Sequence, residues 1–193
     1  LSLRFPTETV AEGTTRVLVP RLKAFMKESS DYAPSKAPVF YNPAMALNRD
    51  FAVLVLQTYQ RMTGRELVCC EPLAGCGVRG IRLANEAEGI RKVVVNDINP
   101  DATRLTEYNA KLNDQVEKIE VINEDANLML NKYAAPRKRF DYVDVDPFGS
   151  PVPYLDSALR AIRDGGLIAL TATDMAPLCG VHPRACVRKY GGK

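Results

Sequence analysis

The sequence has few of the residues from which extracellular, membrane and metal-binding proteins are usually built. It contains no tryptophan, one histidine and five cysteines, an odd number, so the paired cysteines of a disulfide framework are lacking. No apolar run is long enough to cross a membrane, and no segment resembles a signal peptide. Cys179, His182 and Cys186 lie close together without the CxxC pairs of a zinc module, so we expect buried thiols and no metal. These absences favour a cytoplasmic protein.

The composition that remains is that of an ordinary globular domain. The 193 residues are 46% hydrophobic and 25% charged, with a formal net charge of +3, so overall charge does not indicate nucleic acid. Basic residues gather in two places, however. Residues 175–193 contain Arg184, Arg188, Lys189 and Lys193 and no acid, and a second cluster spans residues 137–139. Both clusters are either solvated surface or phosphate contacts.

Strands and helices alternate from residue 67 onward, and this alternation predicts an α/β fold with a parallel sheet and helices on both faces. Before that point we expect a strand at residues 14–20, a helix at 21–29, a loop at 33–38 and a helix at 44–62 that ends before Gly64. The later strands are expected at 67–70, 92–95, 119–122, 142–145 and 167–171, and the helices between them at 80–88, 100–112, 126–133 and 153–162. Ligands of such sheets bind beyond the carboxyl ends of the strands.

The first of these strands ends at Glu71 and is followed by a glycine loop. Gly75 and Gly77 allow a tight turn and a close approach of ligand to backbone, and the next helix offers free N–H groups. The spacing formally matches GxGxxG, the dinucleotide fingerprint, but several nucleoside-binding sheets share it. Glycines needed only for close packing of strand and helix are the alternative.

Acidic residues follow the second and third strands. Asp97 is well placed to accept from both hydroxyls of a ribose, because Asn99, directly before Pro100, is the better cap for the next helix. Asp125 has two possible roles that the sequence does not separate. It caps the helix that begins at Ala126, accepts from the amine of an adenine, or does both.

The fourth strand runs into Asp146-Pro147-Phe148-Gly149. Asp146 can accept a hydrogen bond from an exocyclic amine of a nucleobase and so aim its nitrogen lone pair at an electrophile. Pro147 fixes the turn, and Phe148 is flat enough to stack on a base. This cluster suits methyl transfer to an amine and has no evident use in hydride transfer. A proline-rich connector with a buried phenylalanine is the structural alternative.

Taken together, these strand ends resemble the class I S-adenosylmethionine-dependent methyltransferases, and DPFG resembles their DPPY-type motif for exocyclic amines. Further motifs resemble the tRNA guanine-26 N2-dimethyltransferase family along nearly the whole chain. They are Val10-Ala11-Glu12-Gly13, Arg16-Val17-Leu18-Val19-Pro20, Phe40-Tyr41-Asn42-Pro43, Asn48-Arg49-Asp50, Thr171-Ala172-Thr173-Asp174, and the tail from Cys179-Gly180 to Tyr190-Gly191-Gly192-Lys193.

This resemblance implies a Rossmann-like catalytic domain at residues 66–193 and an N-terminal extension at 1–65 that packs on it. It also implies methyl transfer, once or twice, from S-adenosyl-L-methionine to the 2-amino group of guanine 26 in tRNA. Members of the family continue beyond this point, so we expect a sheet incomplete at its C-terminal edge and no C-terminal tRNA-binding domain. No membrane and no obligatory protein partner are expected.

The resemblance also assigns roles to single residues. Asp146, Pro147 and Phe148 are the expected catalytic set, with Asp146 as the carboxylate and Phe148 stacking on the base. The expected cofactor contacts are Phe40, Arg49, Glu71, Gly75, Gly77, Arg79, Asp97, Asp125 and Ala126. Without the family, a surface ion pair of Arg49 with Asp50 or Asp31, and a solvated Arg79, are the simpler hypotheses.

Two other functions remain open at this stage. A nicotinamide-dependent oxidoreductase would use GxGxxG and Asp97 but leave Asp146-Pro147-Phe148 without a role. A non-catalytic RNA-binding module is favoured by the basic tail and opposed by the set of acids at the strand ends.

Overall fold

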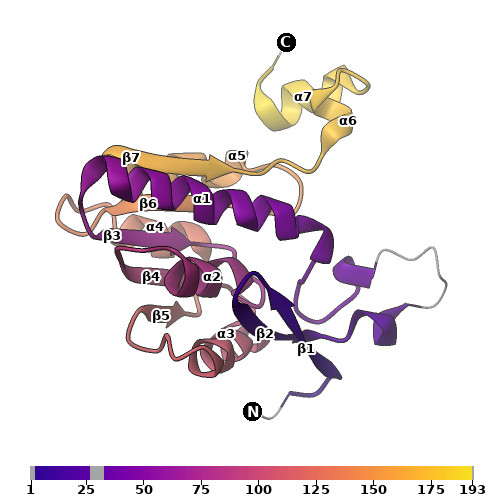
Figure 1. Ribbon diagram of the computed structural model, residues 1–193. Helices are drawn as coiled ribbons and strands as arrows, with labels where there is room; N and C mark the ends of the chain where they lie inside the picture. The colour runs from indigo at the N-terminus through magenta and orange to yellow at the C-terminus, as the bar shows by residue number, and fades with distance from the viewer. Residues whose placement is uncertain (1–2, 27–32, 193) are drawn as a thin grey trace.

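The computed structural model describes residues 3–26 and 33–192 and places a five-stranded parallel sheet at the centre of the molecule (Figure 1). The strand order is β5-β4-β3-β6-β7, and every neighbouring pair is parallel. The chain runs outward from β3 in one direction and then returns to β6 on its other side. The predicted α/β fold is confirmed, and the carboxyl ends of β3 and β6 meet at the switch point where such sheets bind ligands. The strands are β3 (Leu67–Glu71), β4 (Ile90–Asn96), β5 (Ile119–Ile122), β6 (Phe140–Val145) and β7 (Ile162–Leu170).

Helices cover both faces of this sheet. On one face, α1 (Ala46–Thr63) and α2 (Val78–Glu86) form a core with Cys69, Val93 and Val95. On the other, α4 (Ala126–Lys132) and α5 (Val152–Ala161) pack on Cys70, Val94 and Val143. Adjacent residues of one strand thus serve opposite faces, because side chains alternate along a strand. Burial on both faces explains the continuous apolar run Val93–Val95 in β4.

A β-hairpin lies beside α3 (Pro100–Leu112) and is attached to it by two asparagines (Figure 1). Asn109 Oδ1 accepts from the Leu18 amide at 2.7 Å, and its Nδ2 donates to the Leu18 carbonyl at 3.1 Å. One turn later, Asn113 makes the same pair of bonds with Arg16, at 3.0 and 2.7 Å. The side chains thus satisfy the open edge of the second hairpin strand. The hairpin consists of β1 (Thr7–Glu12) and β2 (Thr15–Pro20).

Two expectations for the N-terminal region were wrong. β1 was not predicted as a strand, because its alternation places mostly polar residues on an exposed surface. The helix expected at 21–29 is a single 3-10 turn, η1 (Leu22–Phe25), and Met26 is extended; residues 27–29 lie outside the described residues. η1 buries none of its side chains and has no side-chain cap, so nothing compensates the cost of starting a longer helix.

The segment before α1 forms two short turns. η2 (Ala33–Ser35) lies within the region expected to be a loop. η3 (Pro43–Met45) leads directly into α1, and the Asn42 side chain caps it by accepting from the Ala44 amide. α1 ends at Thr63 with Gly64 in the left-handed conformation, as the sequence predicted.

The C-terminal part differs from expectation in the length of its last strand. β7 begins at Ile162, directly after α5, and its register against β6 shifts between Phe140 and Tyr142. Within the described residues β7 pairs only with β6, so it is an edge strand. After it, α6 (Met175–Leu178) and α7 (Pro183–Tyr190) stand apart from the sheet (Figure 1). The division into residues 1–65 and 66–193 stays a prediction, since α1 shares a core with β3 and β4.

No helix within residues 3–26 and 33–192 combines the length and the apolar character that a membrane crossing requires. Within the same ranges, no three side chains of histidine, cysteine, aspartate or glutamate gather closely enough to hold a metal ion. The expectation of buried thiols is wrong for Cys179, which is exposed, and for Cys186, which is half-buried.

Candidate active site

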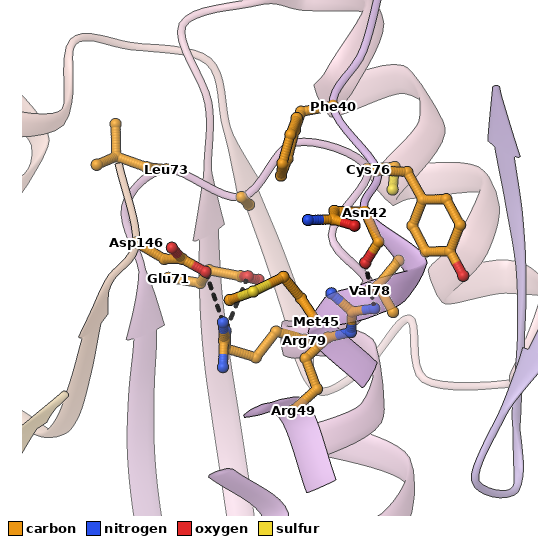
Figure 2. A pocket seen from close by; sticks show the side chains of 12 residues that line it. Phe40, Asn42, Met45, Arg49, Glu71, Leu73, Cys76, Val78, Arg79 and Asp146 are labelled. Atoms are coloured by element: carbon orange, nitrogen blue, oxygen red, sulfur yellow. Dashed lines mark hydrogen bonds and ion pairs between the residues drawn. The ribbon is translucent and has the colours of Figure 1, made fainter. Parts of the chain in front are cut away.

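A cavity of about 640 Å³ opens at the carboxyl ends of β3, β4 and β6, within the usual size of a small-molecule site, about 300–1,000 Å³. Its walls include six of the predicted site residues. They are Phe40, Gly75, Asp97, Asp146, Pro147 and Phe148. A smaller recess shares Phe40 and Asp146 with it and is also lined by Arg49, Glu71 and Arg79 (Figure 2). The structure thus brings together nine of the twelve predicted residues.

The glycine loop between β3 and α2 has the conformation that the sequence predicted. Gly75 and Gly77 have φ of +56° and +71°, in the left-handed region that favours glycine. A Cβ on Gly75 would stand 2.6 Å from the carbonyl oxygen of Phe40. Any side chain at residue 75 would therefore displace the N-terminal segment that carries Phe40.

Asp97 holds the same loop from the end of β4. Its Oδ2 accepts from the Gly75 amide at 2.7 Å and its Oδ1 from the Asn99 amide at 2.9 Å. Asn99 caps α3 by accepting from the Asp101 amide at 3.0 Å, as predicted. Partial burial raises the pKa of Asp97. Its side chain is not a helix cap, and each of its oxygens keeps a lone pair for a ligand in the cavity.

Asp125 caps α4, one of the two roles that the sequence left open. It is exposed, and its Oδ1 accepts from the Leu128 amide at 3.0 Å. Neither Asp125 nor Ala126 is among the described residues that line the cavity or the recess. The contact with an adenine stays a prediction. Gly77 is likewise absent from both walls and acts on the site through the shape of the loop.

Arg79, on the first turn of α2, is buried among three carboxylates and an amide. Its Nη2 lies 2.7 Å from Asp146 Oδ2 (Figure 2), and its Nη1 lies 2.7 Å from Asn48 Oδ1. Asp144 is 3.3 Å from Nη1 and Glu71 is 3.7 Å from Nε. The hypothesis of a solvated Arg79 is therefore wrong, since its side chain is only 5% exposed.

Arg49 is also buried, and it pairs with a residue that was not predicted for the site. Its Nε and Nη2 donate to the two carboxylate oxygens of Glu12, at 2.7 and 2.5 Å, and Nη2 also donates to the Asn42 carbonyl at 3.0 Å. Tyr41 adds a hydrogen bond to Glu12 at 2.9 Å. The expected surface pair of Arg49 with Asp50 is wrong, because Asp50 pairs with Arg82 at 2.7 Å. Asp31, the other expected partner, lies outside the described residues.

Phe148 stands at the mouth of the cavity and is 72% exposed. Its ring meets that of Phe40 edge to face, with centroids 4.7 Å apart and planes at 85°. The following loop is fixed by two bonds of 2.9 Å between Gly149 and Thr173, one through the Thr173 hydroxyl and one through its amide. The alternative of a connector with a buried phenylalanine is therefore wrong, and Phe148 is exposed enough to stack.

Burial changes the ionisation of the acids around Arg79. Desolvation raises the pKa of the Glu71 carboxyl to about 8, and Arg79 offsets only part of that rise. The pKa of Asp144 is raised for the same reason, and Asp144 also accepts from the hydroxyl of Tyr142. Three negative charges against one guanidinium would be costly in this setting, so protonation of Glu71 near neutral pH relieves the excess.

This shift predicts a loss of stability with rising pH. Because the pKa of Glu71 is raised in the folded protein, the unfolded chain releases the proton first as the pH rises. The contribution of Glu71 to stability is therefore complete below about pH 4.5 and is lost between that pH and about pH 8. Between pH 5 and 7.5 the loss is roughly 3 kcal/mol, at about 1.4 kcal/mol per pKa unit. Urea unfolding of the wild type and of Glu71→Gln at these pH values checks it. The variant should lose this slope, whereas parallel slopes would contradict the assigned pKa. Glu66→Gln, just before β3, is the matched control.

Comparison with known proteins identifies the family. Residues 13–193 match the sequence model of a protein family, which is described as N2,N2-dimethylguanosine tRNA methyltransferase. The chain belongs to this family. The resemblance predicted from the sequence motifs is therefore confirmed.

Curated members of the family are similar over most of the chain. The tRNA (guanine(26)-N(2))-dimethyltransferase of Methanococcus maripaludis is 46% identical over 185 residues, which are 94% of this chain and 46% of the relative. The enzyme of the same name from Pyrobaculum islandicum is 52% identical over 154 residues, 80% of this chain and 41% of the relative. The chain spans about half the length of the curated relatives it matches.

Solved structures agree with the fold. Trm1 from Pyrococcus horikoshii, solved as a complex with S-adenosyl-L-methionine, has a TM-score of 0.80 and 37% identity, covering 95% of this chain and 47% of that one. The tRNA m1G37 methyltransferase of M. jannaschii, at 20% identity and a TM-score of 0.63, covers 87% of this chain and 44% of that one and shares the fold.

Three residues of the site were not found from the sequence. Glu12 and Asn48 lie within motifs that resemble the family, but the sequence assigned them no function in the site. Asp144 was predicted only as part of a buried strand. Asp144 did carry a signal. In the run Asp141 to Asp146, an acid at every second or third position of an otherwise apolar strand is unusual, since buried charges are retained only with partners.

Proposed function

We propose that this protein transfers one or two methyl groups from S-adenosyl-L-methionine to the 2-amino group of guanine 26 in tRNA. Membership of the family supports this, as do the names of the relatives. The observation that carries the proposal is the position of Asp146. Its carboxylate lines the cavity on the same edge of the sheet as the glycine loop and Asp97.

The site fits the proposed cofactor in size and in donor set. The Gly75–Gly77 loop, the carboxylate of Asp97 and the ring of Phe40 surround a cavity large enough for a nucleoside. In the proposal Asp97 takes the ribose, while Glu71, Arg49 and Arg79 lie around the recess next to the reacting end, and Asp125 and Ala126 are left for the adenine. S-adenosyl-L-methionine would supply an electrophilic methyl group on a sulfonium.

Asp146 would act on the amine. The 2-amino group of guanine is a poor nucleophile, because its lone pair is delocalised into the ring. Accepting one N–H would orient the nitrogen and stabilise the positive charge that develops on it. Pro147, which is buried and has no N–H, keeps the turn from competing for the carboxylate.

Phe148 would hold the base. A guanine stacked and paired within folded RNA must be flipped out to reach Asp146, at a cost of a few kcal/mol. Stacking on an aromatic ring is worth about 1–3 kcal/mol per base and offsets much of that cost. Phe148, which is 72% exposed and meets Phe40 edge to face, is available for this contact.

α7 offers a surface for the phosphates of the same RNA. Asp174 holds this helix close to the cavity through Lys189 at 2.8 Å and through the hydroxyl of Tyr190, and Thr173, one residue earlier, lines the cavity. Arg184 and Arg188 are exposed and one turn apart, with side chains about 5–6 Å from each other at Cβ. They carry no ion pair with any described residue.

Replacing Arg184 and Arg188 together by alanine should weaken tRNA binding and lower its dependence on salt. Each lost phosphate contact should reduce the slope of log K against log salt by about 0.7–0.9. Binding measured from low to moderate salt tests this. The double variant Arg61→Ala/Arg91→Ala, near the amino ends of the strands, removes the same charge and should keep the slope. An unchanged slope in the α7 variant would mean that Arg184 and Arg188 form a solvated surface and do not contact the phosphates of tRNA.

One experiment separates the proposed function from its alternatives. The protein is incubated with tRNA and S-adenosyl-L-methionine, and methylated guanine is mapped by mass spectrometry, beside titrations with S-adenosylhomocysteine and NADH. Methyl groups at guanine 26 and affinity for S-adenosylhomocysteine are the expected results. Affinity for NADH alone, or a tRNA shift without methyl transfer, would replace the proposal by the oxidoreductase or the binding module. All five cysteines are free, which suits the cytoplasmic location proposed with this function.

A further inference from the structure

Asp146 uses only one of its two oxygens within the protein. Oδ2 accepts from Arg79 Nη2 at 2.7 Å, while Oδ1 has no hydrogen-bond partner among the described residues. The side chain is 22% exposed and lines both the cavity and the recess. One oxygen is therefore held and the other is free to accept from an amine.

The guanidinium that holds Oδ2 is itself fixed from three elements. Asn48 on α1 accepts from Nη1, and Asp144 on β6 lies 3.3 Å from the same nitrogen. Glu71 at the end of β3 faces Nε (Figure 2). A planar guanidinium has its donors in one rigid fork. Nε lies 3.7 Å from Glu71 and has no hydrogen bond among the described residues, so the contacts of Nη1 are the ones that also determine where Nη2 points.

Asp144 is in turn oriented by a hydrogen bond from Tyr142. Its side chain is 2% exposed, and the Tyr142 hydroxyl donates to the same oxygen that faces Arg79. Its other oxygen, Oδ1, is buried without a hydrogen bond. A buried acid that is only half satisfied is costly to keep, and its two contacts, with the Tyr142 hydroxyl and the guanidinium of Arg79, both fall on one oxygen.

We propose that Arg79 is the positioning residue of Asp146, with Tyr142, Asp144 and Asn48 fixing its guanidinium. This inference rests on the proposed methyl transfer to an amine. It differs from the direct contact with the cofactor predicted for Arg79, since four protein side chains already face its nitrogens. The two roles give opposite kinetic results.

Arg79→Lys tests the difference, because lysine keeps the charge but lacks the fork. A positioning role predicts that kcat falls about 100-fold, the usual cost of an ångström of misplacement. The dissociation constant of S-adenosylhomocysteine, measured by calorimetry, should change by less than about threefold. A dissociation constant weakened about 100-fold with a normal kcat at saturating cofactor would overturn the proposal. Arg104→Lys, exposed on α3, is the matched control.

Tyr142→Phe guards against a variant that simply fails to fold. It removes only the hydroxyl that donates to Asp144. The loss of this hydrogen bond should lower kcat by about tenfold without changing cofactor affinity. Unfolding curves of both variants check that they are folded. An unchanged kcat in folded Tyr142→Phe would remove Tyr142 and Asp144 from the proposed chain of contacts.

Crystal structures of the wild type and Arg79→Lys with S-adenosylhomocysteine decide the proposal without turnover. The Asp146 carboxyl should leave its position in the variant, while the bound cofactor product stays in place. A carboxyl that keeps its position would overturn the role of Arg79, whatever the kinetics. If instead the wild type transfers no methyl group to tRNA, the proposed function fails, and the crystal comparison still decides whether Arg79 positions Asp146.

Discussion

Replacing Asp146 with alanine is expected to lower the rate of methyl transfer to tRNA by about 100- to 1,000-fold or more, the usual cost of losing an electrostatic contact to the reacting group. The carboxylate reaches the cavity through an oxygen that no described side chain occupies. Its loss would leave the amine without an acceptor to orient it. Transfer of tritium from the labelled cofactor to tRNA measures the rate.

Cofactor affinity should survive in the same variant. The glycine loop is held by Asp97 and not by Asp146. Arg79 keeps its contacts with Asp144, Glu71 and Asn48 in the variant. Titration with S-adenosylhomocysteine should therefore give a dissociation constant close to that of the wild type. Asp156→Ala, on the exposed surface of α5, is the control and should transfer methyl groups normally. An active Asp146→Ala variant would refute the role of this residue.

The second large effect is on stability, through Glu12 at the end of β1. Glu12→Ala should lower the free energy of unfolding by about 3–5 kcal/mol, the usual cost of removing one partner from a buried pair. The side chains of Arg49 and Glu12 are 8% and 6% exposed, so the guanidinium would remain charged, buried and without its bidentate partner. Urea unfolding followed by circular dichroism measures this.

Two further variants separate the ion pair from the fold of the hairpin. Glu8→Ala, exposed on the same strand, should change stability by about 0.5 kcal/mol or less. The double variant Glu12→Leu/Arg49→Met should regain part of the loss, because two apolar side chains leave no buried charge behind. If Glu12→Ala is as stable as Glu8→Ala, the pair does not hold the hairpin.

The pair also matters for the site. Glu12 accepts from Tyr41, and Arg49 donates to the Asn42 carbonyl, so both act on the segment directly after Phe40. The Phe40 carbonyl in turn lies where a Cβ on Gly75 would stand. The β-hairpin, α1 and the glycine loop together determine where the ring of Phe40 meets Phe148. A destabilised Glu12 variant should therefore bind tRNA less well, even where it remains folded.

The fold followed from the sequence because its signals are local. Apolar strands alternate with helices, and the glycine loop with Asn99-Pro100 marks where helices begin, so the parallel sheet and its carboxyl edge were predictable. Expectations failed where local signals are weak. β1 is mostly exposed and polar, and no side chain of residues 22–25 is fully buried. Pairing with β2 therefore decided the first segment, and weak packing decided the second.

The sequence by itself determined the sheet, the glycine loop and the presence of an acid and an aromatic residue at the end of β6. Only the tertiary structure decided which charges meet. Arg49 pairs with Glu12 across 37 residues, and Arg79 pairs with Asp146 across 67. Periodicity describes which face a side chain occupies, whereas an ion pair depends on distances of a few ångströms between elements far apart in the chain. Burial then makes each such pairing costly to break.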